Sequence, residues 1–278
     1  MRIRYGCKIT FRVDIPTPTV CLVDLRPERR AEAHEDVPFT TSPAQLLKTE
    51  RDAFGNIVRR FIAQPGETTL KLAGTVDDSG LPDARDPEAA RLSIANLPVE
   101  TLQYLSGSRY CETDKLSQLA WDIFGAIPTD AQLVDDICGF VHENITFDYT
   151  RARSTRTALE TLQEGVGVCR DFAHLAITLC RALNIPARYV NGYLGDIGVP
   201  ANPDPMDFNA WFEAYLGGRW ITFDARHNAR RIGRIAIAHG RDAADVPMLQ
   251  TFGPHVLTSF AVTTHEIPDD IAAEKVSA

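Results

Sequence analysis

Residues 165–183 read GVGVCRDFAHLAITLCRAL, a glycine-containing loop that runs directly into a helical pattern. Apolar residues recur there at the spacing of one helix face, at Phe172, Ala176, Leu179 and Leu183. Cys169 falls in the first turn of this predicted helix, where unpaired N–H groups and the helix dipole favour a thiolate. The pattern therefore predicts a nucleophilic cysteine, although a free cysteine is more often a small buried residue with no chemical role.

A longer stretch around Cys169 resembles the nucleophile segment of the bacterial transglutaminase-like superfamily. The matching residues are TAL at 157–159, GVGVCRDFAHL at 165–175 and CRALNIPARYVNGY at 180–193, and the resemblance extends over residues 110–265. That family places a cysteine at the start of this helix and a histidine and an aspartate on two neighbouring strands, as in papain-like proteases. The resemblance implies an α+β fold, with a transglutaminase-like (papain-like) core of helices packed on an antiparallel sheet, preceded by a β-sandwich-like N-terminal domain.

A β-hairpin is predicted over residues 209–226, where NAWFEAYL and RWITFDAR flank a Gly-Gly turn. In the register set by this turn, Asn209 and Asp224 become diagonal neighbours on one face, about 7 to 8 Å apart. The opposite face is apolar and is predicted to be core. It consists of Ala210, Phe212, Ala214, Leu216, Ile221, Phe223 and Ala225. The aromatic residues beside Asn209, which we expect to bind substrate, are Trp211, Tyr215 and Trp220.

The resemblance aligns the family's catalytic histidine with Asn209 and its aspartate with Asp224. An amide cannot accept a proton near neutral pH, so residue 209 cannot act as a general base. His227 is the nearest substitute, but a continuous strand would turn it away from Asp224, and only a bulge or a strand end at Ala225 would bring it back.

The predicted catalytic set is therefore Cys169, Asn209, Asp224 and His227. Asp224 could also be an ordinary hairpin residue paired with Arg226. The other histidines considered, which more often make structural hydrogen bonds, are His174, His142 and His239.

The first part of the chain has a different pattern. Short alternating apolar runs separated by turn residues predict an antiparallel β-domain over residues 1–110. These runs lie at residues 8–13, 19–25, 58–63 and 69–76. Helical patterns begin near Thr113, so the core domain is predicted over residues 111–278, with one helix capped by Asp114 and a second by Thr129 or Asp130. Strands at residues 232–238 and 257–266 are expected to complete the core sheet.

Composition excludes several classes of protein. With 44% hydrophobic and 24% charged residues and no apolar run of 18, the chain reads as a soluble globular protein without a membrane role. The N-terminus lacks the apolar region of a signal peptide, so we expect a cytoplasmic protein with six free cysteines. A net charge of −8 argues against a nucleic-acid partner. No phosphate loop, dinucleotide fingerprint or metal motif is present, and no cofactor or metal is predicted.

Three functions fit these patterns. We favour a cysteine-dependent amide-bond hydrolase or acyltransferase that uses Cys169 in an atypical Cys-Asn-Asp arrangement on a peptide, protein or small amide substrate. The main alternative is a catalytically inactive binding module that holds a peptide or small ligand in the same cleft. The third is a structural protein whose β-domain mediates assembly.

Overall fold

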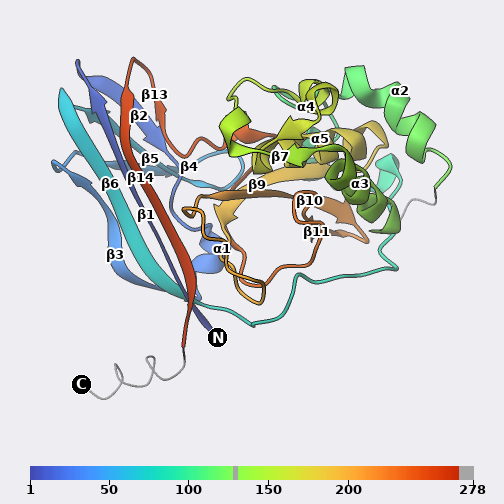
Figure 1. Cartoon of the computed structure of the whole chain (residues 1–278), viewed down its shortest axis with the longest axis horizontal. Coiled ribbons are helices and arrows are strands. Elements are labelled where there is room, and N and C mark those ends of the chain that lie inside the picture. The colour runs from blue at the N-terminus through green and yellow to red at the C-terminus, as the bar shows by residue number, and fades with distance from the viewer. Residues whose placement is uncertain (128–130, 269–278) are drawn as a thin grey trace.

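The computed structural model describes residues 1–127 and 131–268, and it places a β-sandwich beside an α+β core (Figure 1). The sandwich consists of two antiparallel sheets with strand orders β14-β1-β6-β3 and β13-β2-β5-β4. The strands of the first sheet are β1 (Arg2–Val13), β3 (Ala33–Ser42), β6 (Gly66–Asp77) and β14 (Val256–Ile267). Those of the second are β2 (Thr17–Cys21), β4 (Lys48–Arg51), β5 (Ile57–Ala63) and β13 (Gln250–Thr251). The β-sandwich-like N-terminal part is thus confirmed.

The C-terminal strands do not follow the prediction. β14 pairs with β1 along its length and β13 pairs with β2, so the segment expected to complete the core sheet returns to the sandwich. The boundaries 1–110 and 111–278 therefore do not separate the two parts of the fold. Alternation identifies a strand but not its neighbour, and β14 covers the edge that β1 would otherwise expose. This pairing buries Val262 and Thr264.

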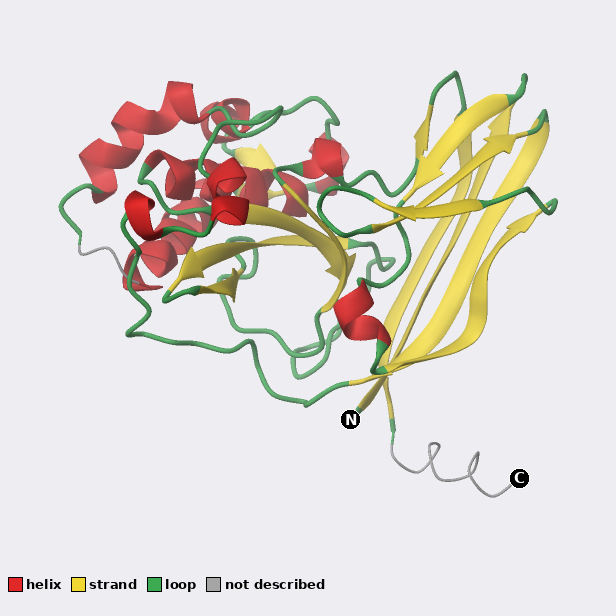
Figure 2. Ribbon diagram, turned by 180° about the vertical axis from the view of Figure 1, so that it is seen from behind, coloured by secondary structure: helices red, strands yellow, loops and turns green. Residues whose placement is uncertain are grey.

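The core contains an antiparallel sheet with strand order β11-β10-β9-β12, and helices cover one of its faces (Figure 2). Its strands are β9 (Ala187–Tyr193), β10 (Asn209–Leu216), β11 (Arg219–Phe223) and β12 (Ile235–Gly240). The helices are α2 (Thr113–Phe124), α3 (Ala131–Asn144), α4 (Ala158–Glu164) and α5 (Cys169–Ala182), with a short α1 (Pro27–Arg30) near the sandwich. This is the predicted α+β core, and β12 is the strand that completes its sheet.

The predicted N-cap of α2 is wrong, and the predicted caps of α3 lie outside the described residues. Glu112 is the N-cap of α2, and Asp114 lies inside its first turn. The proposed caps of α3, Thr129 and Asp130, lie outside the described residues. No helix in the described ranges is both long and apolar enough to cross a bilayer.

The hairpin register follows the prediction. Tyr215 opposes Trp220 and Glu213 opposes Thr222 across β10 and β11. All seven residues of the predicted core face are buried, and β10 packs against α5. However, β11 ends at Phe223, so the residues that follow form a turn rather than a continuing strand.

Helix α5 is the central element of the core. Every residue of the helix except Arg170 is buried, as expected for a helix enclosed by other helices and the sheet. The helix ends before Asn184, which adopts a left-handed φ of 62°, and Asn-Ile-Pro at 184–186 then leads into β9 as the sequence indicates. A short parallel pair, β7 (Thr146–Phe147) and β8 (Val166–Gly167), precedes its N-terminus.

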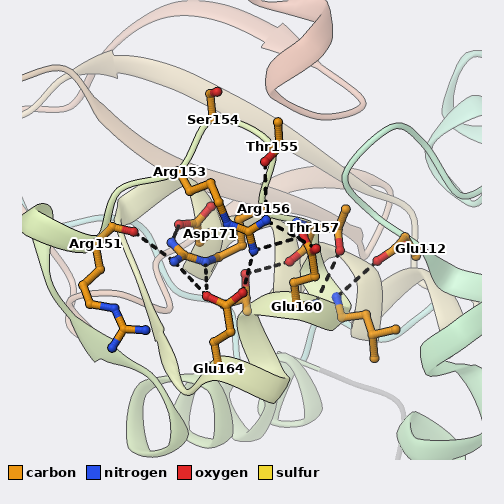
Figure 3. A network of polar contacts seen from close by, with 12 residues as sticks. Glu112, Arg151, Arg153, Ser154, Thr155, Arg156, Thr157, Glu160, Glu164 and Asp171 are labelled. Atoms are coloured by element: carbon orange, nitrogen blue, oxygen red, sulfur yellow. Dashed lines mark hydrogen bonds and ion pairs between the residues drawn. The ribbon is translucent and has the colours of Figure 1, made fainter.

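A buried ionic network fixes where α5 begins (Figure 3). The Asp171 carboxylate, in the first turn, accepts hydrogen bonds from the Val168 N–H (3.0 Å) and from Arg156 Nη1 (3.1 Å). The side chains of Asp171 and Arg156 are 0% and 2% exposed. Arg156 also donates to Glu164 at the end of α4. The network therefore joins the end of one helix to the start of the next, directly beside Cys169.

Replacing Arg156 with Met should lower the free energy of unfolding by about 2–4 kcal/mol, because the buried Asp171 carboxylate would lose one of its two guanidinium partners and keep only Arg170. The matched control is Arg153→Met in the same network. Arg153 is 38% exposed, so its loss should cost below about 1 kcal/mol. Urea unfolding followed by tryptophan fluorescence measures both variants. Equal losses would contradict the assigned role of the buried pair.

Candidate active site

Cys169 is the first residue of α5 and is 9% exposed. The backbone N–H groups of Ala210 and Arg170 lie within hydrogen-bonding reach of its sulfur. Ala210 follows Asn209 at the start of β10, so the helix N-terminus and the first residues of this strand meet at the thiol. The charged side chains that act on the sulfur are Arg226 and Asp207.

The protonation state of Cys169 differs from the expectation of a stabilised thiolate. Burial raises the pKa of the thiol from 9.0 to about 11, and this outweighs the opposing effect of Arg226. Enclosure removes the sulfur from water, and the helix terminus and one guanidinium do not compensate for that loss. At such a pKa only about one thiol in ten thousand is ionised at pH 7. Efficient attack by Cys169 near neutrality would therefore need a group that accepts the thiol proton.

Asn209 is held by polar contacts on both sides of its amide. Its Oδ1 accepts a hydrogen bond from Arg226 Nη1 at 2.9 Å. Its Nδ2 donates to the carbonyl of Leu194 at 3.4 Å. Asn209, which we expected at the position of the family's histidine, thus contacts an arginine side chain.

Asp224 is a buried carboxylate that organises the turn after β11. Its Oδ1 accepts from the backbone N–H groups of Arg226 and His227, both at 3.0 Å. Its Oδ2 accepts from His227 Nδ1 and from Arg234 Nη2, both at 2.8 Å. Burial opposes ionisation, but Arg234 and then His227 outweigh it and hold the pKa of Asp224 well below its usual range.

The early end of β11 changes the position of His227. The turn closes with a hydrogen bond from the Asn228 N–H to the Asp224 carbonyl, which folds His227 back onto the aspartate. This is the strand end that the sequence analysis required for His227 to meet Asp224. The result is an imidazole whose Nδ1 is oriented by a carboxylate and whose Nε2 remains for another partner.

A cavity of about 270 Å³ lies next to this group of residues. Asn209, Arg226 and His227 form part of its wall. The other lining residues were not predicted from the sequence, and they include Tyr149, Asp207 and Arg231. Burial raises the pKa of Asp207, and its carboxylate accepts a hydrogen bond from the Tyr149 hydroxyl at 3.3 Å. No motif signals these residues, because they come from loops and turns whose conformation depends on the finished fold.

The structure places the three predicted substrate-binding aromatics elsewhere. Trp211 is 2% exposed and packs under the guanidinium of Arg234. Tyr215 and Trp220 contact each other, and Tyr104 packs edge-on against Trp220. None of the three lines the cavity beside Asn209. On that face Trp211 lines a different cavity together with Glu213 and Thr222, and Tyr104, from the segment between β6 and α2, packs on Trp220, which the hairpin pattern alone could not indicate.

The remaining histidines have structural contacts, as expected. His174 is buried, stacks on Tyr110 and accepts a hydrogen bond from the Ala243 N–H. His142 Nδ1 donates to the carbonyl of Arg226 at 2.9 Å. His239 is buried, and burial lowers its pKa well below the usual value. In the described ranges, no group of three or more His, Cys, Asp or Glu side chains could hold a metal ion.

Comparison with known proteins agrees with the geometry. Residues 117–225 match the family model of the transglutaminase-like superfamily. The solved structure of a Cytophaga hutchinsonii protein named "Putative Cysteine Protease" is 33% identical, with a TM-score of 0.81, and the match covers 95% of this chain and 90% of that one. The chain belongs to the transglutaminase-like superfamily. It therefore shares its fold with cysteine-dependent hydrolases and acyltransferases.

Uncharacterised mycobacterial proteins are also related to this member of the superfamily. One from Mycobacterium tuberculosis is 30% identical over 244 residues, which cover 80% of this chain and 76% of that protein. One from Mycobacterium leprae is 36% identical over 98 residues, about a third of each chain. The similarity to the first protein extends well beyond the residues matched by the family model.

We predict that iodoacetamide alkylates Cys169 with a rate constant that rises about tenfold per pH unit from about pH 7 to about pH 10, because only the thiolate reacts. The rise should level off near the raised pKa of about 11. Mass spectrometry of the peptide that contains Cys169 measures the rate, with Cys169→Ser as the control for assignment. A plateau below about pH 8 would show a stabilised thiolate instead.

Proposed function

We propose that this chain is a cysteine-dependent amide-bond hydrolase or acyltransferase in which Cys169 is the nucleophile and His227, oriented by Asp224, accepts the thiol proton. The observation that carries the proposal is the 2.8 Å hydrogen bond from His227 Nδ1 to Asp224 Oδ2. It supplies an oriented base in a site where Asn209 aligns, in our proposal, with the family's histidine. The substrate class is a peptide, a protein or a small amide.

The reaction follows from the protonation states. Because the thiol is protonated, its proton must move to His227 Nε2 as the sulfur attacks the carbonyl carbon. The Asp224 carboxylate, which is ionised, stabilises the imidazolium that forms. Nε2 must come within hydrogen-bonding distance of the sulfur in the substrate complex, where such contacts commonly tighten.

The later steps return the proton. Collapse of the tetrahedral intermediate breaks the C–N bond, and the imidazolium donates its proton to the leaving amine. Water or a second amine then attacks the thioester and releases the free thiol. We expect the oxyanion to be stabilised by unpaired backbone N–H groups at the start of α5, of which the Arg170 N–H lies within reach of the sulfur.

The test is a screen of casein and of a panel of peptide p-nitroanilides for cleavage by the purified chain. Cys169→Ser should abolish turnover, and His227→Gln should lower kcat by about 100-fold to 10,000-fold. His34→Gln is the matched control, since this exposed histidine lies in the sandwich and pairs with Asp77. Full activity of His227→Gln together with loss in Asp207→Asn would instead make Asp207 the base and refute the assignment.

A specific observation favours the second candidate, a binding module without catalysis. The raised pKa of Cys169 and the amide at position 209 are both tolerable in a site that only holds a ligand. Asn209→His separates the two functions. If the original chain shows no turnover and this variant gains it, the original chain is a binding module built on an enzyme scaffold.

We further propose a reducing location such as the cytoplasm, and no nucleic-acid partner. All six cysteines are free thiols, which suits a reducing compartment. The net charge of −8 disfavours contact with a phosphate backbone.

A further inference from the structure

Arg226 is the most firmly positioned residue of the cavity wall. Its backbone N–H donates to Asp224 Oδ1, and its carbonyl accepts from His142 Nδ1. Its guanidinium donates to Asn209 Oδ1 and lies 3.9 Å from the centre of the Phe147 ring. Contacts from α3, β7, β10 and the turn after β11 therefore fix both the main chain and the side chain.

The partners of this guanidinium are neutral. Asn209 provides an amide oxygen and Phe147 an aromatic face, and in the described part of the chain no carboxylate forms an ion pair with Arg226. Arg234, by contrast, pairs with both Asp83 and Asp224. Arg226 is half-buried, lines the cavity and acts on the Cys169 sulfur. Asp207, in the same cavity wall, acts on Arg226 electrostatically but forms no ion pair with it in the described part of the chain. A positioned guanidinium that no carboxylate contacts directly is suited to bind one with two of its N–H groups.

A second arginine contributes to the same wall. The side chain of Arg231 is 6% exposed, its Nη2 donates to the Gly195 carbonyl at 2.9 Å, and it forms an ion pair with Asp196 at 3.6 Å. Its Nε is buried and has no hydrogen-bond partner within the described residues. A buried donor without a partner is costly. Asp196, Asp204 and Asp207 add carboxylates to the same lining, so within the described residues Arg226 is the arginine of this wall that has no ion pair.

We propose that the cavity beside Cys169 selects a ligand or substrate whose carboxylate binds Arg226, and that Asn209 is a positioning residue that holds this guanidinium. The substrate part rests on the proposed function. The role explains the residue at position 209, because an amide oxygen accepts a hydrogen bond from arginine at every pH, whereas a protonated imidazole has no acceptor and would repel it. The carboxylate comes from a peptide C-terminus or from an acidic side chain close to the reacting carbonyl.

The test compares two alkylating reagents at Cys169, the anionic iodoacetate and the neutral iodoacetamide. Their rate constants are measured on the Cys169 peptide at low ionic strength, relative to free cysteine in the same buffer. We expect Cys169 to favour iodoacetate by about tenfold over free cysteine, and the preference to fall as salt is added. Arg226→Gln should abolish the preference. Arg219→Gln, which removes an exposed arginine paired with Asp86, should keep it.

A second variant covers the case in which Arg226→Gln does not fold. Asn209→Ala keeps the charge but removes its anchor, so the preference, taken as the ratio of the two rate constants, should fall by about threefold. The same preference in the original chain and in both variants would overturn the proposal. The measurement needs no turnover. The proposed carboxylate site can therefore be refuted while the enzyme proposal stands, or supported even if the chain is only a binding module.

Protection experiments identify the source of the carboxylate. N-acetylglycine carries a terminal carboxylate, the N-acetylglutamic acid α-amide carries a side-chain carboxylate, and N-acetylglycinamide carries none. If only N-acetylglycine slows alkylation by iodoacetamide, the carboxylate comes from a peptide C-terminus. If only the N-acetylglutamic acid α-amide slows it, the carboxylate comes from an acidic side chain. Equal protection by all three, or protection by none, would overturn the proposal.

Discussion

The buried carboxylate of Asp171 is the contact on which the position of Cys169 depends. Asp171 lies in the first turn of α5, accepts the Val168 N–H and pairs with Arg156. Because an unpaired charge in the core is costly, the chain can begin this helix only where both partners meet the carboxylate. The start of α5, and with it the sulfur, is thereby fixed against the first residues of β10.

A second buried carboxylate organises the other half of the site. The Asp224 carboxylate accepts hydrogen bonds from the backbone N–H groups of Arg226 and His227. These hydrogen bonds end β11 and form the turn that contains both residues. The same side chain orients the imidazole and pairs with Arg234. One aspartate therefore turns both the imidazole and the guanidinium toward the cavity. Asn209, on the neighbouring strand β10, accepts a hydrogen bond from that guanidinium through its Oδ1. This explains how an imidazole and a guanidinium both come to line the cavity next to Asn209.

Sequence periodicity and turn chemistry predicted the elements that depend on local rules. The Gly-Gly turn gave the hairpin register, and the apolar spacing gave α5 with Cys169 in its first turn. The end of β11 was not predictable, because it depends on the Asp224 side chain competing with the strand for backbone donors. The pairing of β14 with β1 and the enclosure of Cys169 depend on long-range packing. Tyr149 and Asp207 join the site from loops, which carry no periodic signal.

The central claim is that His227, and not residue 209, handles the proton of Cys169. A crystal structure of the chain with Cys169 covalently bound to a peptide aldehyde tests it most directly. We predict that His227 Nε2 lies about 2.6 to 3.2 Å from the hemithioacetal oxygen, or in direct contact with the sulfur, while Nδ1 stays on Asp224. An adduct in which His227 contacts neither atom, with Asp207 or solvent in its place, would contradict the account.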